Sequence, residues 1–257
     1  MPNDESNFWL AGLRAILRRW PLPLPRVLAR RSRRHGYIAP LGSVRLGDLR
    51  HLEPVSRVYG FDRGQPIDRY YIAKFLAAHA SLVRGRVLEI GGRDYTEQYG
   101  GGRVARSDIL NVKAGDPQTT FVADLADGAG VPDAAFDCVI LTQTLHLVFD
   151  VPAAIGTLHR ILKPGGTLLL SVPGTISQIE QGVWRSVWYW GFTRLSLERL
   201  FASVFPRTLL EIFQYGNVLA SIAFLEGLVA EEFTPAELMY HDELYPLLLG
   251  LRATKPP

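Results

Sequence analysis

The sequence Arg86-Val-Leu-Glu-Ile-Gly-Gly92 decides the fold, because it is a short apolar run that ends in two glycines. Such a run predicts a strand buried on both faces, followed by a turn in which the backbone can approach a ligand closely. Similar runs cover residues 103–108, 119–124, 136–141 and 167–172. Residues 151–162 have helical spacing and end before Lys163-Pro-Gly-Gly166. Strands that alternate with helices indicate an α/β fold, in which helices cover both faces of a mostly parallel sheet.

The pattern continues beyond Pro173 with less regularity. We expect a helix, a strand, a long apolar helix and a last strand, over residues 196–205, 208–215, 218–232 and 245–252. Residues 54–257 are therefore predicted to form the main domain. A basic N-terminal extension, residues 1–53, precedes it.

The N-terminal extension differs from the rest of the chain in charge. Residues 1–40 carry a net charge of +6, whereas the whole chain carries +3. A helix is predicted before Pro21, with an apolar face that consists of Trp9, Leu13, Ile16, Leu17 and Trp20. This extension is either flexible or docked on the main domain by its apolar face, or it makes a peripheral contact with an anionic membrane surface. We favour the first interpretation, because the helix carries only three cationic residues.

Composition excludes several classes of protein. Of the 257 residues, 47% are hydrophobic and 21% are charged, which is typical of a globular chain and not of a disordered one. The basic excess lies in the extension, so we expect no nucleic-acid-binding surface. Cys138 is the only cysteine, which excludes an intramolecular disulfide and a cysteine-rich zinc site. No apolar run is long enough to span a membrane, and we expect a cytoplasmic protein.

Ligands of an open parallel sheet bind at the carboxyl ends of the strands, where the strand order reverses. The candidates for such a site are Glu89, Gly91, Gly92, Asp108, Ile109, Asp124, Leu125, Thr142 and Gln143. Asp108 follows Glu89 by nineteen residues, close to the spacing at which an acid binds ribose hydroxyls. Asp124 is expected to accept from an adenine amino group, with Ile109 and Leu125 against the base.

Each of these acids also has a structural alternative. Asp108 and Asp124 are favoured residues for capping a following helix or turn, although their order at successive strand ends favours a ligand. Glu89 is expected to be buried by its strand, so its carboxylate needs partners. Those partners are the following loop, the amino group of a cofactor, or both.

The turn after the first strand narrows the choice of cofactor. It reads Gly91-Gly-Arg-Asp-Tyr-Thr96, which lacks the Gly-x-Gly-x-x-Gly of a dinucleotide site. The chain also lacks the Gly-Lys-Ser/Thr of a nucleoside triphosphate site. A cofactor that carries an adenosine and no phosphates fits best.

Five motifs, in this order along the chain, resemble the class I S-adenosylmethionine-dependent methyltransferases. They are Val87-Leu-Glu-Ile-Gly91, the acid Asp108, Val122-Ala-Asp-Leu125, Phe136-Asp-Cys-Val-Ile140 and Leu158-His-Arg-Ile-Leu-Lys-Pro-Gly-Gly166. The last two also resemble the methyltransferase type 11 group. The resemblance implies a Rossmann-like sheet of seven strands with an antiparallel last strand. It also implies S-adenosyl-L-methionine as the cofactor.

The flanks resemble bacterial methyltransferases of polysaccharide and glycosyltransferase gene clusters. The similar segments are residues 58–71, 190–193 and 245–256. This resemblance implies O-methylation of a sugar or another small cell-envelope acceptor. The alternatives are a protein of the same fold that binds the cofactor without turnover, and a nicotinamide-dependent oxidoreductase. The missing glycine fingerprint counts against the oxidoreductase.

His146 follows the fourth predicted strand, where a general base can face a substrate hydroxyl. Packing at the start of the next helix is an equally good interpretation. Candidates for contact with the acceptor are Arg69, Tyr71, Tyr189, Trp190 and Phe192, because aromatic faces stack on sugars. The alternatives are a lid that packs on its own core, a membrane-interface contact and, for Arg69, a plain ion pair. The trio His241-Asp-Glu243 is not expected to bind a metal, since contiguous side chains rarely point to one centre.

Overall fold

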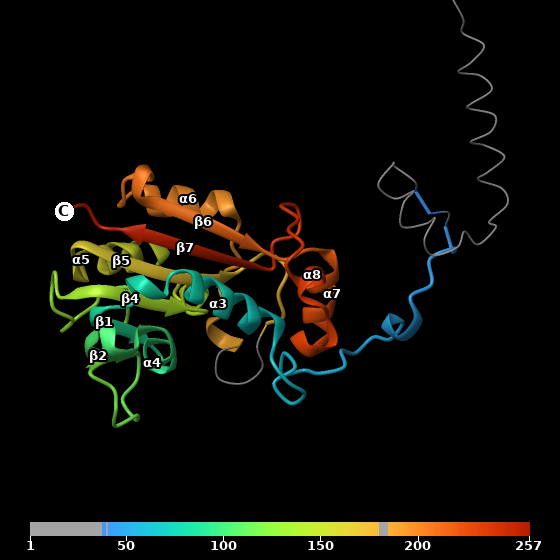
Figure 1. The fold of residues 1–257 in the computed structure, drawn as a ribbon, viewed down its shortest axis with the longest axis horizontal. Coiled ribbons are helices and arrows are strands. Elements are labelled where there is room, and N and C mark those ends of the chain that lie inside the picture. Colours follow the sequence, from blue (N-terminus) through green and yellow to red (C-terminus); the bar gives the residue numbers. More distant parts are fainter. Residues whose placement is uncertain (1–37, 40, 180–184) are drawn as a thin grey trace, which may run out of the picture. The chain divides into compact units, whose positions relative to one another are not determined.

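The computed structural model describes residues 38–39, 41–179 and 185–257 (Figure 1). The chain divides into two units, Met1–Leu52 and Glu53–Pro257. The described residues of the first unit contain the short 3-10 helix η1, Gly47–Leu49. The apolar helix predicted before Pro21 lies outside the described residues. The second unit holds the sheet and its helices.

The sheet has seven strands in the order β3-β2-β1-β4-β5-β7-β6. Their bounds are β1 Gly85–Ile90, β2 Val104–Asn111, β3 Phe121–Val122, β4 Phe136–Thr142, β5 Leu162–Pro173, β6 Leu210–Tyr215 and β7 Leu248–Thr254. Strands β1 to β5 pair in parallel, and β7 runs antiparallel to both β5 and β6. The predicted sheet with an antiparallel last strand is confirmed. The order reverses between β1 and β4, which places a ligand site at their carboxyl ends.

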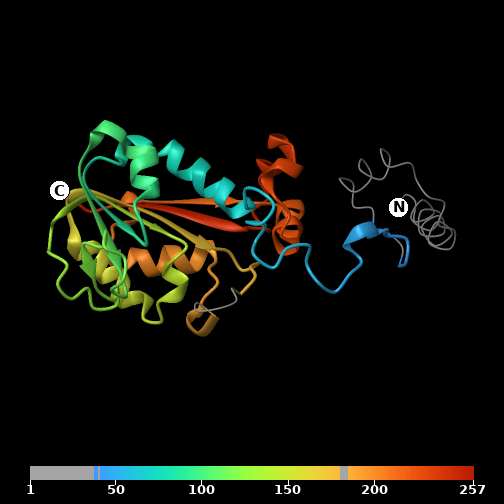
Figure 2. The same ribbon diagram turned by 90° about the horizontal axis from the view of Figure 1, so that it is seen from below.

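Helices cover both faces of this sheet. Their bounds are α3 Ile67–Ala78, α4 Asp94–Gly100, α5 Val151–Ile161, α6 Arg194–Ala202, α7 Val218–Glu226 and α8 Pro235–Leu238. Figure 2 shows α3 and α4 on one side of the sheet and α6 on the other. In β4, Cys138 and Ile140 pack in the core under α3 and α7, whereas Val139 and Leu141 pack in the core under α5 and α6. Burial on both faces explains why this strand reads as a continuous apolar run.

Short 3-10 helices complete the unit, and one of them carries His146. They are η2 Ala80–Leu82, η3 Gly101–Arg103, η4 Leu145–Leu147, η5 Arg185–Val187, η6 Arg207–Leu209 and η7 Ala230–Glu232. Of these, η4 follows β4 and η5 follows β5.

Several predicted boundaries differ from the structure, such as the strand predicted over 119–124, which covers only Phe121–Val122, and the last strand, which covers Leu248–Thr254. Two of the differences have identifiable reasons. The second strand continues three residues beyond Asp108, because Ile109 and Leu110 pair with Glu89 and Ile90 of β1. The long helix predicted over 218–232 ends at Glu226, where Gly227 adopts a left-handed conformation with φ of +68°. A Cβ on Gly227 would lie 2.4 Å from the carbonyl oxygen of Ser56, so this helix end requires glycine.

Candidate functional site

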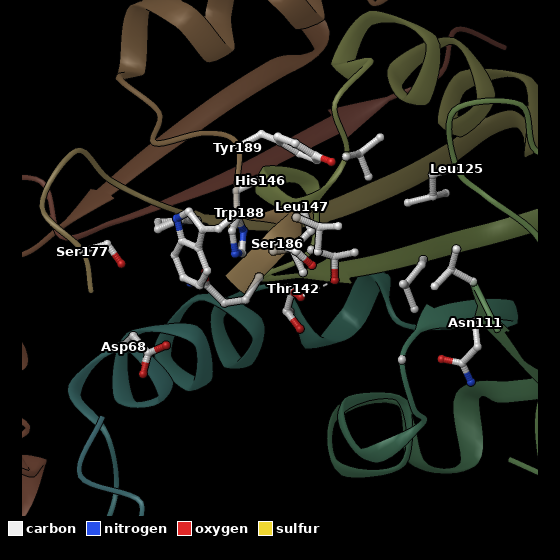
Figure 3. Close-up of a pocket in the computed structure, with 18 of the residues that line it drawn as sticks. Asp68, Asn111, Leu125, Thr142, His146, Leu147, Ser177, Ser186, Trp188 and Tyr189 are labelled. Carbon is white, nitrogen blue, oxygen red and sulfur yellow. Dashed lines mark hydrogen bonds between the residues drawn. The ribbon is translucent and has the colours of Figure 1, made fainter. Parts of the chain in front are cut away.

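A pocket of about 1350 Å³ lies at the carboxyl ends of β1 to β4 (Figure 3). Its lining falls into two parts. The strand-end half consists of Ile90, Gly91, Leu110, Asn111, Ala123, Asp124 and Leu125. The aromatic half consists of Asp68, Arg69, His146, Phe149, Trp188 and Tyr189. Thr142, at the end of β4, lies between the two halves.

The strand-end half offers hydrogen-bonding groups beside an apolar wall. The exposed carboxylate of Asp124 accepts the N–H of Ala126 through Oδ1 at 2.8 Å, and its second oxygen makes no hydrogen bond within the described part of the chain. The amide of Asn111 donates to Thr119 Oγ1 at 2.8 Å. Leu110 and Leu125 are buried next to these polar groups. The half therefore presents free acceptors and an apolar surface to the same ligand.

Gly91 begins the turn after β1 and has a φ of +93°, which favours glycine. Its N–H donates to the carbonyl oxygen of Leu110 at 3.1 Å, which fixes the turn to the end of β2. Gln143 follows β4 with a φ of +45°, uncommon for a residue with a side chain. Its N–H donates to the Ser171 carbonyl oxygen at 2.9 Å, and the residue lines the pocket. The structure therefore places Gly91, Thr142 and Gln143 at the pocket, whereas Gly92 is not part of its lining.

Asp108 does not line the pocket, so the prediction that it contacts a ribose there is wrong. Its side chain is 1% exposed and forms ion pairs with Arg86, at 2.7 Å, and with Arg106, at 3.0 Å. Arg86 lies near the amino end of β1, so the carboxylate points away from the strand ends. The residue that ends β2 at the pocket is Asn111. Ile109 faces the opposite side of β2 from Leu110 and does not line the pocket either.

Glu89 binds the loop and not the pocket. Its carboxylate accepts three hydrogen bonds, from the N–H of Tyr95 and from both the N–H and the hydroxyl of Thr96, at 2.7 to 3.2 Å. Burial raises the pKa of this carboxyl, and the bonds from Thr96 oppose the shift. Of the two partners expected for Glu89, the structure shows the loop. The carboxylate holds the start of α4 against β1.

His146 lines the aromatic half from η4 and is 2% exposed. Its ring lies against the Trp188 indole, with 4.3 Å between the ring centres. Burial, with a further contribution from the Arg69 charge, lowers the pKa of His146 to about 4. Its Nδ1 has no hydrogen-bond partner among the residues described. At neutral pH the side chain is therefore a neutral imidazole with an unused nitrogen.

Phe149 and Tyr189 form the outer wall of the aromatic half, and Trp190 packs beside them. The Phe149 ring lies 5.3 Å from the Tyr189 ring and 6.0 Å from the Trp190 ring, measured between centres. Tyr189 lines the pocket, as predicted. Trp190 does not, and instead donates its indole N–H to the Val148 carbonyl oxygen at 3.1 Å. It supports the wall from behind.

Two predicted acceptor residues belong to the hydrophobic core. Tyr71 is fully buried, donates its hydroxyl to the Leu238 carbonyl oxygen at 2.6 Å and stacks on Tyr215. Phe192 is 3% exposed and packs in the core under α5 and α6. Neither lines the pocket, because each side chain points from its segment into the core. Closeness to the site in sequence does not determine which way an aromatic side chain points. Arg69, in contrast, does line the pocket.

Sequence reasoning missed Asp68, Phe149 and Asn111 as pocket residues. Asp68 is the second residue of α3, where an acid is common at a helix start and gives no sign of a ligand site. Phe149 stands alone in the loop after η4. Trp188 lines the pocket and belongs to the aromatic stretch, residues 184–192, that also contains the predicted acceptor residues Tyr189, Trp190 and Phe192. Trp184, in the same stretch, lies outside the described residues.

A family profile described as a methyltransferase domain matches residues 61–214, more than half of the chain. The chain belongs to this methyltransferase family. The matched segment contains most of the residues that line the pocket. S-adenosyl-L-methionine is accordingly the cofactor, as the sequence motifs predict.

Similarity to individual proteins is partial. Over 127 residues the chain is 27% identical to Probable polyketide synthase 10 from Dictyostelium discoideum, covering 49% of this chain and 5% of that protein. Over 87 residues it is 33% identical to the ubiquinone/menaquinone biosynthesis C-methyltransferase UbiE from Marinomonas sp. (strain MWYL1), covering 34% and 32%. The chain thus spans less than a third of the length of either relative. A solved S-adenosylmethionine-dependent methyltransferase from Archaeoglobus fulgidus aligns with a TM-score of 0.48 at 13% identity, covering 73% and 94%.

The strand-end half fits the adenosine part of this cofactor. The free oxygen of Asp124 and the side-chain oxygen of Asn111 can accept from hydroxyl and amino groups, and Leu110 and Leu125 can lie against a purine. At the pocket end of the second strand stands Asn111, whereas Asp108 is paired with Arg86 and Arg106. The residues present therefore suit a nucleoside without phosphates.

The described residues offer little support for other kinds of site. No cluster of three or more His, Cys, Asp or Glu side chains in this part of the chain is arranged to hold a metal ion. Burial raises the pKa of the Cys138 thiol to about 12, which keeps it protonated at neutral pH. Within the same residues, no helix combines the length and the apolar character needed to cross a membrane.

Proposed function

We propose that this chain transfers a methyl group from S-adenosylmethionine to a hydroxyl oxygen of a small, sugar-like acceptor. One observation carries the proposal: a single pocket joins a half that suits an adenosine to a half that contains aromatic rings and the ionisable side chains Asp68, Arg69 and His146. A protein that only bound the cofactor would not need the second half.

The bound cofactor supplies a methyl group on a positively charged sulfur, which is already a strong methyl donor. The protein's own part is to hold the acceptor in line with that methyl group and to exclude water. Positioning of this kind can supply about 7 to 11 kcal/mol of the barrier. His146 and Trp188, whose rings pack against each other in the aromatic half, limit where an acceptor can lie.

The aromatic half favours a sugar-like acceptor. Tyr189 is 45% exposed and Phe149 is 69% exposed, so both rings are available for stacking. Arg69, Asp68 and Ser177 line the same region and offer donors and acceptors to hydroxyl groups. This combination of flat apolar faces and polar side chains is what a sugar ring requires. It also agrees with the resemblance of the flanks to polysaccharide-cluster methyltransferases.

A second candidate is methyl transfer to a carbon of an aromatic ring. Several relatives are named as UbiE C-methyltransferases, and three of them share 33% to 37% identity with this chain over 68 to 87 residues. A planar ring would also stack on Tyr189. The position of the new methyl group in the product distinguishes the two reactions.

The test is an assay with S-adenosylmethionine that carries a labelled methyl group, offered with nucleotide sugars, glycan fragments and phenolic rings. Mass spectrometry and NMR of the product locate the label on oxygen or carbon. Label on a sugar oxygen supports the proposal, and label on a ring carbon supports the second candidate. Calorimetry with S-adenosylhomocysteine and with NAD separates both from an oxidoreductase. Tight binding of S-adenosylhomocysteine without transfer to any acceptor would indicate binding without turnover.

A further inference from the structure

We propose that Asp68, and not His146, accepts the proton of the acceptor hydroxyl. This inference rests on the proposed function, since it concerns the same pocket and the same reaction. The position of the carboxylate, the charges around it and the contrast with His146 support it.

Asp68 is a buried carboxylate that still faces the pocket. It lies on the first turn of α3, is 9% exposed and belongs to the aromatic half together with Trp188 and His146 (Figure 3). Oδ1 accepts the N–H of Arg69 at 2.7 Å, and Oδ2 lies 3.1 Å from the Arg69 guanidinium. A carboxylate can accept about four hydrogen bonds, so these two leave room for a hydroxyl.

The groups around Asp68 set its basicity. Arg69 lies next to it on α3, Tyr95 interacts with both charges from α4, and Arg57 and His146 line the same pocket from other segments. Burial raises the pKa of Asp68 above the usual value for an aspartate, and the Arg69 charge only partly opposes this shift. A carboxylate with a raised pKa is a stronger base than an ordinary one.

The pKa of His146 is shifted in the opposite direction, away from that of a good base. Burial lowers the pKa of its imidazole to about 4, so it remains neutral at physiological pH but takes up a proton reluctantly. Its Nδ1, which none of the described residues hydrogen-bonds, and its packing on Trp188 suit a group that orients an acceptor through one hydrogen bond. His146 is therefore a positioning residue in this scheme.

The proton and electrons balance without a further reactant. The acceptor hydroxyl gives its proton to Asp68, and the O–H electron pair stays on oxygen to form the new O–CH₃ bond. The bond between the methyl carbon and the sulfonium breaks with both electrons on sulfur, which becomes a neutral thioether. Asp68 then returns its proton to solvent through the pocket mouth. Arg69 stabilises the carboxylate before and after the transfer.

The test compares Asp68→Asn with a matched control, Asp94→Asn, in the full chain. Asp94 lies on the first turn of α4, is exposed and does not line the pocket. For Asp68→Asn we expect kcat with a sugar hydroxyl to fall about 100-fold or more, the usual contribution of a general base. We expect the loss of wild-type activity toward acidic pH to disappear, because the titrating group is gone. Asp94→Asn should match the wild type in both measurements.

Two further measurements separate proton transfer by Asp68 from cofactor binding and from a structural role. The affinity for S-adenosylhomocysteine, measured by calorimetry, should be unchanged in Asp68→Asn, and a clear loss would assign Asp68 to the cofactor and overturn the inference. With a more acidic phenolic hydroxyl, the deficit of Asp68→Asn should shrink, because such an acceptor needs less help to lose its proton. An equal deficit with both acceptors would indicate a structural role and would also overturn it.

A folding defect in the variant and a failure of the proposed function can each be distinguished from a failure of the role assigned to Asp68. Thermal unfolding shows whether Asp68→Asn is folded, and Asp68→Glu provides a variant that keeps the carboxylate and should keep the acidic limb of the pH profile. If the wild type methylates no hydroxyl, the proposed function fails. If the wild type is active and the folded Asp68→Asn retains its kcat and pH profile, only the role of Asp68 fails.

Discussion

The two halves of the pocket are built from different parts of the fold and present different surfaces. In the strand-end half, main-chain bonds fix the strand ends and their loops: the N–H groups of Gly91, Thr120 and Ala123 donate to carbonyl oxygens of β2 at 2.9 to 3.1 Å. In the aromatic half, the start of α3, η4 and the segment after η5 come together around the pocket, and what they present to it is mainly side chains, such as the packed rings of His146 and Trp188. The first half is part of the sheet, and the second is assembled from three separate segments.

Because of this difference, we expect the two halves to tolerate side-chain substitutions to different degrees. A site built on strand ends changes little when a side chain is replaced, because the ladder of backbone bonds remains. A site built from side-chain contacts changes shape with each substitution. We expect the strand-end half to determine cofactor binding and the aromatic half to determine the choice of acceptor. The following variants test that division, in order of expected effect.

The largest effect is expected from Asp108→Asn. The side chain of Asp108 lies beneath the strand-end half and does not line the pocket. The variant breaks a buried pair with Arg86, whose side chain is 24% exposed and also lies over the Phe136 ring. We expect the free energy of unfolding to fall by about 3 kcal/mol, the lower part of the range for such pairs. Chemical denaturation measures this, and Arg106→Ala, at a 58% exposed side chain, should cost less than about 1 kcal/mol. Weaker S-adenosylhomocysteine binding by folded Asp108→Asn would return this acid to the cofactor site.

The second effect is a loss of stability at acidic pH, and it arises from His146 in the aromatic half. The pKa of His146 is about 4 in the folded chain and about 6.5 when unfolded, so the unfolded state binds more protons between these values. Its contribution to stability is therefore complete above pH 6.5 and is lost as the pH falls to 4, by about 3 kcal/mol. Denaturation of the wild type and of His146→Asn across this range measures it. Parallel curves for the two proteins would refute the buried, neutral state of His146.

Asp124→Ala tests the strand-end half directly. A hydrogen bond to a charged group contributes about 1.5 to 3 kcal/mol, so we expect S-adenosylmethionine affinity to fall by roughly tenfold to a hundredfold. Asp127→Ala is a matched control, because Asp127 accepts from Ala129 N–H at 2.8 Å in the same kind of turn but does not line the pocket. Calorimetry on both variants decides the question. Equal affinities would place the adenosine elsewhere in the pocket.

The smallest effect is expected from Tyr189→Ala. Loss of one stacking ring should raise the KM of the acceptor by about twofold to tenfold, corresponding to about 0.5 to 1.5 kcal/mol, with cofactor affinity unchanged. Tyr71→Phe is the comparison, since it removes only the buried bond to the Leu238 carbonyl oxygen. That variant should lose about 1 kcal/mol of stability and keep the KM. An acceptor KM that changes in Tyr71→Phe but not in Tyr189→Ala would reverse the two assignments.

The fold was predictable because β1, β4 and β5 are largely buried on both faces and therefore read as continuous apolar runs whose ends can be located. The same rule located Asp124 and Thr142, which lie where the strands end. It failed for Asp108, because a strand end read from sequence is uncertain by a few residues, and three residues move a side chain from the pocket to the interior. Tyr71 and Phe192 were misassigned because the sequence does not show which way an aromatic side chain faces. Asp68 gave no signal, since its role depends on a pocket formed with His146 and Trp188, which are distant in sequence.

The attachment of the aromatic wall has a consequence for how the enzyme can change. The carbonyl oxygen of His146 accepts the N–H groups of both Tyr189, at 3.0 Å, and Trp190, at 3.3 Å. These bonds use main-chain atoms, so they are kept whichever side chains occupy positions 188 and 189. Substitutions there can alter the shape and polarity of the acceptor region while the segment stays attached. Laboratory evolution at these two positions is therefore a direct way to obtain methyltransferases with new acceptors from this scaffold.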